Sequence, residues 1–454
     1  MEFLNNLLVN RGPKMQDIDI IVKADYVLTM DKHFAVIKNG AIAVDNGRIA
    51  SVGAADDIFG RYSSKQIVGG EGFITFPGLI NTHTHSPMVY FRGLADDLPL
   101  KEWLEDHIWP AEKKWLSPEF VSDAAELAFL EMLKSGITSC NDMYFYGNEI
   151  ASAAKKIGMR ASVGAGILDF PTSTAQNPAE YLAKAEAFIM RWKGDDLITP
   201  CVAPHSAYAC GPETLHKAKA LSEKHAVRLH IHLSETEWEV EELMALHRSR
   251  PVTFLDSIGF FDESVTAAHC IWVDEEEIET LARRGVGVAH CMESNLKLAS
   301  GFAPVASMLA QGIRVTFGTD GAASNNDLNI LSEMSTTAKV HKALSKDPTV
   351  LNARRVMLMA TRWGAEALGL ADVTGSIEAG KAADVVLADV RKPHLTPMYD
   401  LYSSIVYSMS AADIHSVIID GKLVMNGRTL LTGDEPEILR RANEWGKKIK
   451  GKGR

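Results

Sequence analysis

Two histidines separated by one residue follow the apolar run 73–80. The run has the composition of a short buried strand, and His83 and His85 lie at its end. Residues two apart in an extended segment point to the same side, so both imidazoles can reach one metal ion. Two surface histidines at a strand end would give the same pattern, and the rest of the chain has to decide between the two interpretations.

Ionisable residues also occur at or just after the ends of later apolar runs. Taken singly, each has an ordinary explanation, because a lone histidine is often structural and an Asp-Gly step is often a turn. Glu235 could simply open a helix, where a carboxylate suits the macrodipole. Their shared position at strand ends is the informative feature. These residues are His205, His232, Glu235, His269 and Asp320.

Eight apolar runs of strand length alternate with helical patterns through the middle of the chain. Strands alternating with helices at this spacing predict a parallel sheet, and eight of them predict a closed TIM-type (β/α)₈ barrel of the α/β class. An open, doubly wound sheet is the alternative. The predicted strands are 73–80, 138–144, 160–167, 198–204, 228–233, 265–269, 286–290 and 314–318, and the last barrel helix is predicted over 352–368.

A barrel of this kind brings the carboxyl ends of its strands together at one rim. Three imidazoles and one carboxylate at that rim suit Zn²⁺ and leave a coordination position for water. Fe²⁺ and Mn²⁺ accept the same ligands. The fourth strand ends in Pro204-His205 without a lysine that could bridge two ions, so one ion per subunit is predicted. The assigned ligands are His83, His85, His232 and Asp320.

Strand-like segments flank the alternating region on both sides. Asp45-Asn46-Gly47 before it, and Asp420-Gly421 and Asn426-Gly427 after it, are hairpin signals. The two flanks are therefore predicted to pair into one small domain, with the barrel inserted between them. The predicted divisions are a disordered extension over 1–16, a β-sandwich domain with a C-terminal helix over 17–73 plus 371–454, and the barrel over 74–370. Met15 is a possible alternative start.

The composition is that of an ordinary globular protein, with 454 residues, 46% hydrophobic and 23% charged. The net charge of −11 and the absence of a Lys/Arg cluster argue against nucleic acid as a partner. No apolar stretch is long enough to cross a bilayer, so no membrane association is expected. Five scattered cysteines without a Cys-x-x-Cys pair indicate a reducing compartment, and a cytoplasmic protein is expected.

Several motifs resemble those of the amidohydrolase superfamily and, within it, the 5-methylthioadenosine/S-adenosylhomocysteine deaminase family. The resemblance covers essentially the whole chain after Asp17. It implies a metal-dependent barrel, a small purine nucleoside as the substrate and a homo-oligomer. The matching segments are 77–88, 91–97, 204–205, 230–236, 268–270, 294–298 and 318–326.

The resemblance also implies roles for individual residues. It supports His83, His85, His232 and Asp320 as the metal ligands. It makes Glu235 the proton shuttle and His269 a catalytic imidazole, with Asp320 taking the first proton from water. It places His205 against the substrate and Glu112 at the ribose hydroxyls. The implied reaction is hydrolytic deamination at C6 of the adenine ring of a 5′-modified adenosine, which gives the inosine analogue and ammonia.

One departure from the family pattern bears on the substrate. Members that accept S-adenosylhomocysteine are expected to carry an arginine after the third strand, and this chain has Ala165 at the aligned position. No second arginine follows in 169–175. A substrate carboxylate would therefore lack a charge-assisted partner. 5-Methylthioadenosine is expected ahead of S-adenosylhomocysteine, with 5′-deoxyadenosine and adenosine as further candidates.

Three alternatives stay open from the sequence. Triazine chlorohydrolases or aminohydrolases and guanine-type deaminases share much of the pattern, although a ribose-free substrate has no use for Glu112. A non-catalytic scaffold is a third alternative, and it would have no reason to retain the ligand set. Met88, Trp103 and Trp109 either line an apolar pocket for the 5′ substituent or belong to ordinary core packing.

Overall fold

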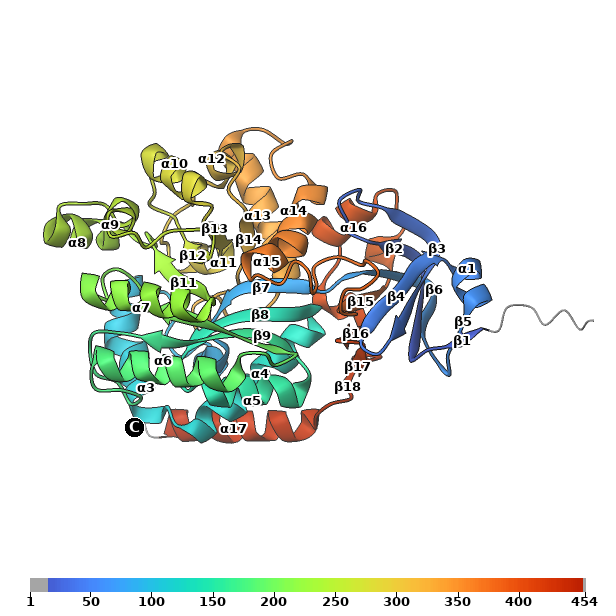
Figure 1. The fold of residues 1–454 in the computed structure, drawn as a ribbon, viewed down its shortest axis with the longest axis horizontal. Helices are drawn as coiled ribbons and strands as arrows, with labels where there is room; N and C mark the ends of the chain where they lie inside the picture. The colour runs from blue at the N-terminus through green and yellow to red at the C-terminus, as the bar shows by residue number, and fades with distance from the viewer. Residues whose placement is uncertain (1–14, 452–454) are drawn as a thin grey trace, which may run out of the picture.

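The computed structural model describes residues 15–451, and its larger part is a barrel of eight parallel strands (Figure 1). Neighbouring strands pair in chain order, and a parallel bridge between Thr84 and Asp320 joins the last strand region to the first. The (β/α)₈ prediction is therefore confirmed against the open sheet. The strands are β7 (Leu79–Thr84), β8 (Ile137–Tyr144), β9 (Arg160–Ile167), β10 (Ile198–Pro204), β11 (Arg228–Leu233), β12 (Val265–His269), β13 (Gly287–His290) and β14 (Val315–Phe317).

Helices cover the outside of the barrel, and their ends follow local signals. Ser117 caps the helix over 118–134 by accepting a hydrogen bond from Phe120 N at 3.1 Å, and Gly158 ends the next helix at a φ of 86°. The main helices are α4 (Pro118–Lys134), α5 (Gly147–Ile157), α6 (Pro178–Trp192), α7 (Pro212–His225), α8 (Glu237–His247), α9 (Pro251–Ser257), α10 (Glu275–Arg284), α11 (Met292–Lys297), α12 (Val305–Ala310) and α13 (Ile330–Ser345).

Several helical features differ from the sequence prediction. The helix predicted over 352–368 is divided into α14 (Ala353–Ala360) and α15 (Arg362–Ala367), and α13 was not predicted. A second unpredicted region follows β7 and extends over the mouth of the barrel. It consists of η1 (Ser86–Phe91), α2 (Leu100–Glu102), the π-helical η2 (Trp103–Ile108) and α3 (Trp109–Trp115).

The apolar run 73–80, predicted as one barrel strand, is shared by two strands. Residues 73–77 end β6 (Gln66–Pro77) and pair with β15 (Val385–Asp389), so residues 74–77 lie in the second sheet and not in the barrel. Gly78 separates β6 from β7. An added Cβ there would lie 1.9 Å from Thr138 Oγ1, so only glycine lets the chain pass. Hydrophobicity is equal on both sides of Gly78 and cannot reveal this boundary.

The chain segments on either side of the barrel form one continuous sheet, on the right in Figure 1. Its two halves share a hydrophobic core that includes Val22, Ile42, Val385 and Ile418. The strand order is β18 (Thr429–Leu430), β17 (Lys422–Asn426), β16 (Ile414–Ile419), β15, β6, β2 (Ile20–Leu28), β3 (Val36–Asp45) and β4 (Arg48–Ala54). The predicted pairing of the flanks into a small β-domain is therefore confirmed.

The C-terminal helix α17 (Glu435–Gly451) packs on the barrel (Figure 1). Trp445 donates its indole N–H to Asp123 of α4 at 3.0 Å, and its ring meets Phe120 edge-on. Arg441 pairs with Asp123 and Glu126 of the same helix. The sequence prediction grouped this helix with the β-sandwich domain, whereas the contacts described here join it to α4 of the barrel.

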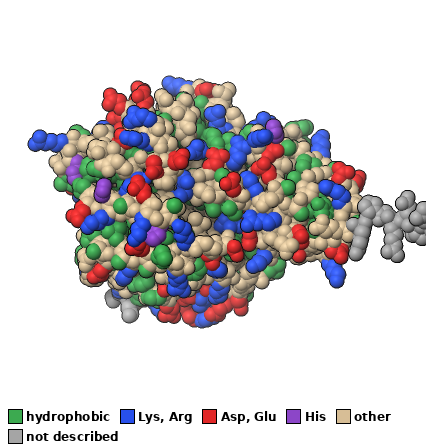
Figure 2. Space-filling view, in the orientation of Figure 1, with side chains coloured by type: hydrophobic (Ala, Val, Ile, Leu, Met, Phe, Trp, Pro, Cys, Tyr) green, Lys and Arg blue, Asp and Glu red, His purple; other side chains and the backbone are tan. Residues whose placement is uncertain are grey.

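The N-terminal extension predicted over 1–16 lies mostly outside the described residues. Gln16 belongs to β1 (Gln16–Asp17), which pairs with β5 (Tyr62–Ser63). None of the helices within residues 15–451 combines the length and apolar character needed to cross a membrane. On the face shown in Figure 2, basic and acidic side chains are interspersed.

We expect Gly78→Ala to lower the free energy of unfolding by at least about 2 kcal/mol, because the new methyl group would overlap Thr138 in a closely packed interior. Chemical denaturation measures this loss. Gly60→Ala is the control, since an added Cβ there meets nothing within 4 Å. Equal stability of the two variants would contradict the boundary at Gly78.

Candidate metal centre and active site

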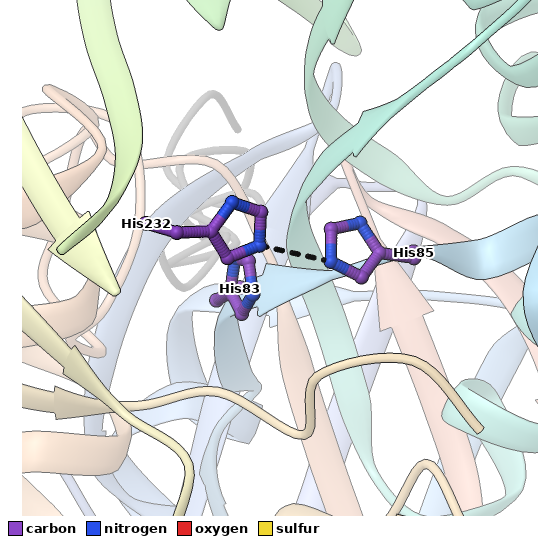
Figure 3. A group of neighbouring side chains, drawn as sticks. All are labelled: His83, His85 and His232. Carbon is purple, nitrogen blue, oxygen red and sulfur yellow. Dashed lines mark hydrogen bonds between the residues drawn. The ribbon is translucent and has the colours of Figure 1, made fainter. Parts of the chain in front are cut away.

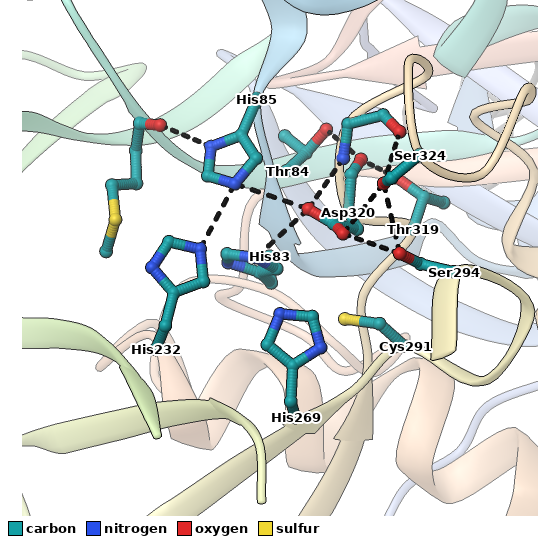
Figure 4. A network of polar contacts seen from close by, with 12 residues as sticks. His83, Thr84, His85, His232, His269, Cys291, Ser294, Thr319, Asp320 and Ser324 are labelled. Carbon is teal, nitrogen blue, oxygen red and sulfur yellow. Dashed lines mark hydrogen bonds and ion pairs between the residues drawn. The ribbon is translucent and has the colours of Figure 1, made fainter. Parts of the chain in front are cut away.

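Four side chains from three separate chain segments meet at the carboxyl-end rim of the barrel (Figures 3 and 4). His83 Nε2 and His85 Nε2 lie 3.4 and 3.2 Å from Asp320 Oδ1. His85 Nε2 lies 3.2 Å from His232 Nε2. Ligands placed 2.0–2.1 Å from a tetrahedral ion are about 3.3 Å apart, so these separations fit one cation. The structure thus brings together the four side chains assigned as ligands.

The chemistry of the donor set also fits a cation. His83 Nε2 is buried and has no hydrogen-bond partner among the described residues. Burial lowers the pKa of His83 to about 3 and keeps that ring neutral, as a ligand must be. Burial also lowers the pKa of His85, but its contacts with Asp320 outweigh burial and raise the value to about 9. A divalent ion bound here would take the place of the positive charge that Asp320 favours on His85.

Each of the three imidazoles presents Nε2 to the centre because its Nδ1 is engaged elsewhere. His85 Nδ1 faces Met143 O at 2.5 Å, and His232 Nδ1 faces His205 O at 2.8 Å. A carbonyl oxygen only accepts, so both Nδ1 atoms carry a proton, and Nε2 is the ring atom that can bind an ion. His83 Nδ1 has an imidazole as its partner instead.

Asp320 is held by groups to which the sequence analysis gave no role. The hydroxyls of Ser294 and Ser324 donate to Asp320 Oδ2 at 2.6 and 2.8 Å (Figure 4). Burial raises the pKa of Asp320, but contacts with His83 and His85 outweigh burial and hold it well below its usual range. The two serines lie in the motifs 294–298 and 318–326, so the sequence marked the segments without indicating the contacts.

Backbone geometry also brings Asp320 to the centre. Its φ is 59°, in the left-handed region that residues other than glycine rarely adopt. An added Cβ at Gly318, two residues earlier, would lie 2.7 Å from His83 Cβ. Glycine is therefore required for the end of β14 to approach β7 so closely, and this approach puts Asp320 beside His83 and His85.

Glu235 and His269 border the same centre. His269 Nε2 lies 3.7 Å from Glu235 Oε2, and His269 Nδ1 faces Asn295 Oδ1 at 2.9 Å. Burial raises the pKa of Glu235, which favours the protonated acid. The Glu239 carboxylate accepts from the backbone N–H of Glu235 at 2.8 Å and so fixes the turn that carries it. Asn295 and Glu239 were not identified from the sequence.

A cavity of about 610 Å³ opens from this centre. His205 lies beside it, with its ring centroid 4.5 Å from that of His232. Glu112 is reached by Tyr144, whose hydroxyl donates to Glu112 Oε1 at 2.5 Å. Burial raises the pKa of the Glu112 carboxyl to about 7, against the opposing effect of the Tyr144 hydrogen bond. Of the eight predicted site residues, the cavity lining includes all except His83.

The wider part of the cavity is mostly apolar. Met88, Trp103 and Trp109, for which pocket lining and core packing were both open, are all in contact with the cavity. Leu168 and Phe170 extend the apolar wall. Among the described residues that line the cavity, Lys113 on α3 is the only lysine or arginine, and it is exposed.

Comparison with known proteins places this geometry in a family. Residues 74–424 match the Amidohydrolase family. The chain belongs to the amidohydrolase family. The 5-methylthioadenosine/S-adenosylhomocysteine deaminase of Thermodesulfovibrio yellowstonii is 54% identical over 433 residues, which cover 95% of this chain and 98% of the relative. The 5′-deoxyadenosine deaminase of Methanosarcina acetivorans is 43% identical over 426 residues, covering 93% and 96%.

Among solved structures, a zinc-bound adenosine deaminase from Xanthomonas campestris has a TM-score of 0.94 and 38% identity, covering 96% of this chain and all of the other. The atrazine chlorohydrolase of Arthrobacter aurescens has a TM-score of 0.87 at 23% identity, which shows a shared fold alone. The family and the converging His/Asp side chains make the protein a hydrolase with a divalent metal site, and not a non-catalytic scaffold.

We expect His232→Ala to reduce the bound metal of the purified protein to a small fraction of the wild-type content, because one of four ligands is lost. Elemental analysis after dialysis against metal-free buffer measures the content per chain. His205→Ala is the matched control, since this neighbouring histidine also lines the cavity but belongs to neither group of described side chains that could hold an ion. Equal metal loss in both variants would contradict the assigned ligand set.

Proposed function

We propose that the protein deaminates the adenine ring of a 5′-modified adenosine at C6 by hydrolysis, with 5-methylthioadenosine as the preferred substrate. The observation that carries the proposal is the meeting of Glu235, His269 and the four assigned ligands at one end of a cavity that also holds Glu112. The relatives named above act on substrates of this class. The products are the corresponding inosine analogue and ammonia.

His83, His85, His232 and Asp320 would hold the metal, and we propose Zn²⁺, with Fe²⁺ and Mn²⁺ as the alternatives that this ligand set accepts. When bound, such an ion lowers the pKa of water from 15.7 to about 7 and so makes a nucleophile available at neutral pH. Asp320 takes the first proton from the attacking water. The Ser294 and Ser324 hydroxyls keep this carboxylate oriented while it does so.

Glu235 moves the protons on the purine side. Burial raises its pKa and so favours the protonated form, which can donate to ring N1 and make C6 electrophilic. As the C–O bond forms at C6, His269 stabilises the charge that develops on oxygen. Glu235, ionised by that first transfer, accepts one of the two protons released by the water and passes it to the exocyclic nitrogen, so the C6–N bond breaks and ammonia leaves. The second proton from the water restores the Glu235 acid. One water molecule is consumed for each ammonia released.

Glu112 is proposed to accept hydrogen bonds from the ribose hydroxyls. Tyr144 occupies part of its acceptor capacity, and a carboxylate has several further acceptor positions. A buried acceptor of this kind penalises a substrate that has no hydroxyl to offer, because the carboxyl is then left unpaired. His205 is proposed to contact the substrate from the end of β10, beside His232.

The apolar walls favour an uncharged 5′ group. A methylthio group or a bare 5′ carbon can pack against Leu168 and Phe170 without losing a polar partner. The amino-acid end of S-adenosylhomocysteine carries a carboxylate, for which only the exposed Lys113 is at hand among the described lining residues. S-Adenosylhomocysteine is therefore placed behind 5-methylthioadenosine, with 5′-deoxyadenosine and adenosine between them.

Triazine hydrolysis and guanine deamination are less favoured, because neither substrate would use Glu112. The cytoplasmic location, the homo-oligomer and the absence of nucleic-acid binding stay predictions from the sequence. All five cysteines are buried and unpaired, which is consistent with a reducing compartment.

Glu235→Gln is expected to keep the metal but to lower kcat by about 10²–10⁴-fold, because an amide cannot shuttle the proton. Ammonia release from 5-methylthioadenosine, measured beside elemental analysis, separates the two effects. Glu237→Gln is the control, since Glu237 begins the adjacent helix and lies outside the main cavity. A near-normal rate for Glu235→Gln would refute its proposed role.

A substrate panel tests the specificity. We expect kcat/KM to be highest for 5-methylthioadenosine, lower for S-adenosylhomocysteine, and below detection for guanine and chlorotriazines. Glu112→Gln should lower kcat/KM for ribonucleosides at least about tenfold, and should change little for a 2′,3′-dideoxy analogue that lacks the hydroxyls. An equal loss of kcat/KM on both nucleosides would show that Glu112 does not bind the ribose hydroxyls.

A further inference from the structure

A second buried histidine lies directly behind one of the assigned ligands. His230 Nε2 is 2.7 Å from His83 Nδ1, and His230 Nδ1 is 3.0 Å from Thr266 O. His83 is fully buried and His230 is 1% exposed. His230 and Thr266 are register partners on β11 and β12, so the sheet itself fixes their contact. Thr266 O, His230 and His83 form a hydrogen-bonded series that leads from the backbone to the candidate metal centre.

We infer that His230 is a positioning residue that selects the ligating tautomer of His83 and holds its ring against the centre. This inference rests on the metal centre proposed above. It concerns a residue two positions before the ligand His232, and the mechanism has no other use for it.

The direction of these hydrogen bonds follows from the acceptor at one end of the series, which is the Thr266 carbonyl oxygen. Thr266 O can only accept, so His230 Nδ1 carries a proton. In the neutral His230 ring, Nε2 then has the lone pair and accepts from His83 Nδ1–H. His83 is left with its lone pair on Nε2, which is the atom near Asp320 and which has no hydrogen-bond partner within residues 15–451. The opposite hydrogen-bond direction would put a proton on His83 Nε2 and prevent that atom from binding a metal ion.

His83 differs in this respect from the other two imidazole ligands. His85 and His232 donate to the backbone carbonyls of Met143 and His205, which no side-chain substitution removes. His83 alone among the three relies on a side chain, and so its orientation can be tested by mutation. Removing the acceptor leaves a buried N–H without a partner and frees the ring to turn. Partners of this kind typically change metal affinity 10–100-fold.

The test compares two substitutions of nearly equal shape. His230→Gln supplies an oxygen that can accept from His83 Nδ1–H, whereas His230→Met supplies none. His341→Met is the matched control, because His341 on α13 is also buried and its histidine partner within residues 15–451 is His290, which has no place among the assigned ligands. The measurement is the rate at which zinc-loaded protein releases Zn²⁺ to a chromogenic chelator, so no activity is needed.

We expect His230→Met to release zinc at least tenfold faster than wild type, and we expect His230→Gln and His341→Met to stay within about threefold of wild type. Release at the same rate from the methionine and glutamine variants would overturn the inference. If His230→Met does not fold, His230→Ala, which leaves space in place of added volume, is judged by the same criterion. A wild-type protein that binds none of Zn²⁺, Fe²⁺ and Mn²⁺ would instead overturn the proposed function.

Discussion

The structure depends on one electrostatic constraint, which is that an ionised carboxylate and three imidazoles are buried against one another at the barrel rim. Asp320 is only 6% exposed, and its Oδ1 lies within 3.4 Å of His83 Nε2 and His85 Nε2. Burying an ion costs several kcal/mol unless it is paired and hydrogen-bonded. Hydrogen bonds from two serine hydroxyls meet part of that need in the protein alone. A divalent cation would supply the opposite charge that Asp320 lacks, and it would give His83 Nε2 the partner that this atom lacks among the described residues.

Backbone positions and helices around the centre place its side chains. Gly318 lets the first and last strands approach, and positive φ angles at His269 and Asp320 turn these residues into the cavity. Such strained backbone positions are typical of functional sites, where the packing around them holds the conformation. The helices that follow β7 form the far wall of the cavity and bring Glu112 to Tyr144. The assigned metal ligands and Glu112 are thus supplied by different layers of the fold.

Much of this could be predicted from the sequence, and the failures have physical reasons. Strand ends were readable because apolar runs stop at polar residues, and the barrel rule then placed His83, His85, His232 and Asp320 at one rim. The boundary at Gly78 was missed because residues on both sides are equally apolar. The packing of α17 was missed because its contacts with Asp123 and Glu126 are ion pairs between distant segments, which leave no periodic signal.

The supporting residues were harder to find than the site itself. Ser294, Asn295 and Glu239 act through hydrogen bonds that only the fold brings within reach. His230 lies in the same motif as His232, yet alternation along a strand gives both the same side and does not reveal their different depths. The helices covering the mouth of the barrel were not predicted, although three of their apolar residues were recognised as possible pocket lining.

The most direct test of the central claim is anomalous diffraction at the zinc edge from crystals of the zinc-loaded wild-type protein. The account predicts one strong peak per chain, about 2.0–2.1 Å from Nε2 of His83, His85 and His232 and from a carboxylate oxygen of Asp320. No peak at this position, or a peak held by other side chains, would contradict it.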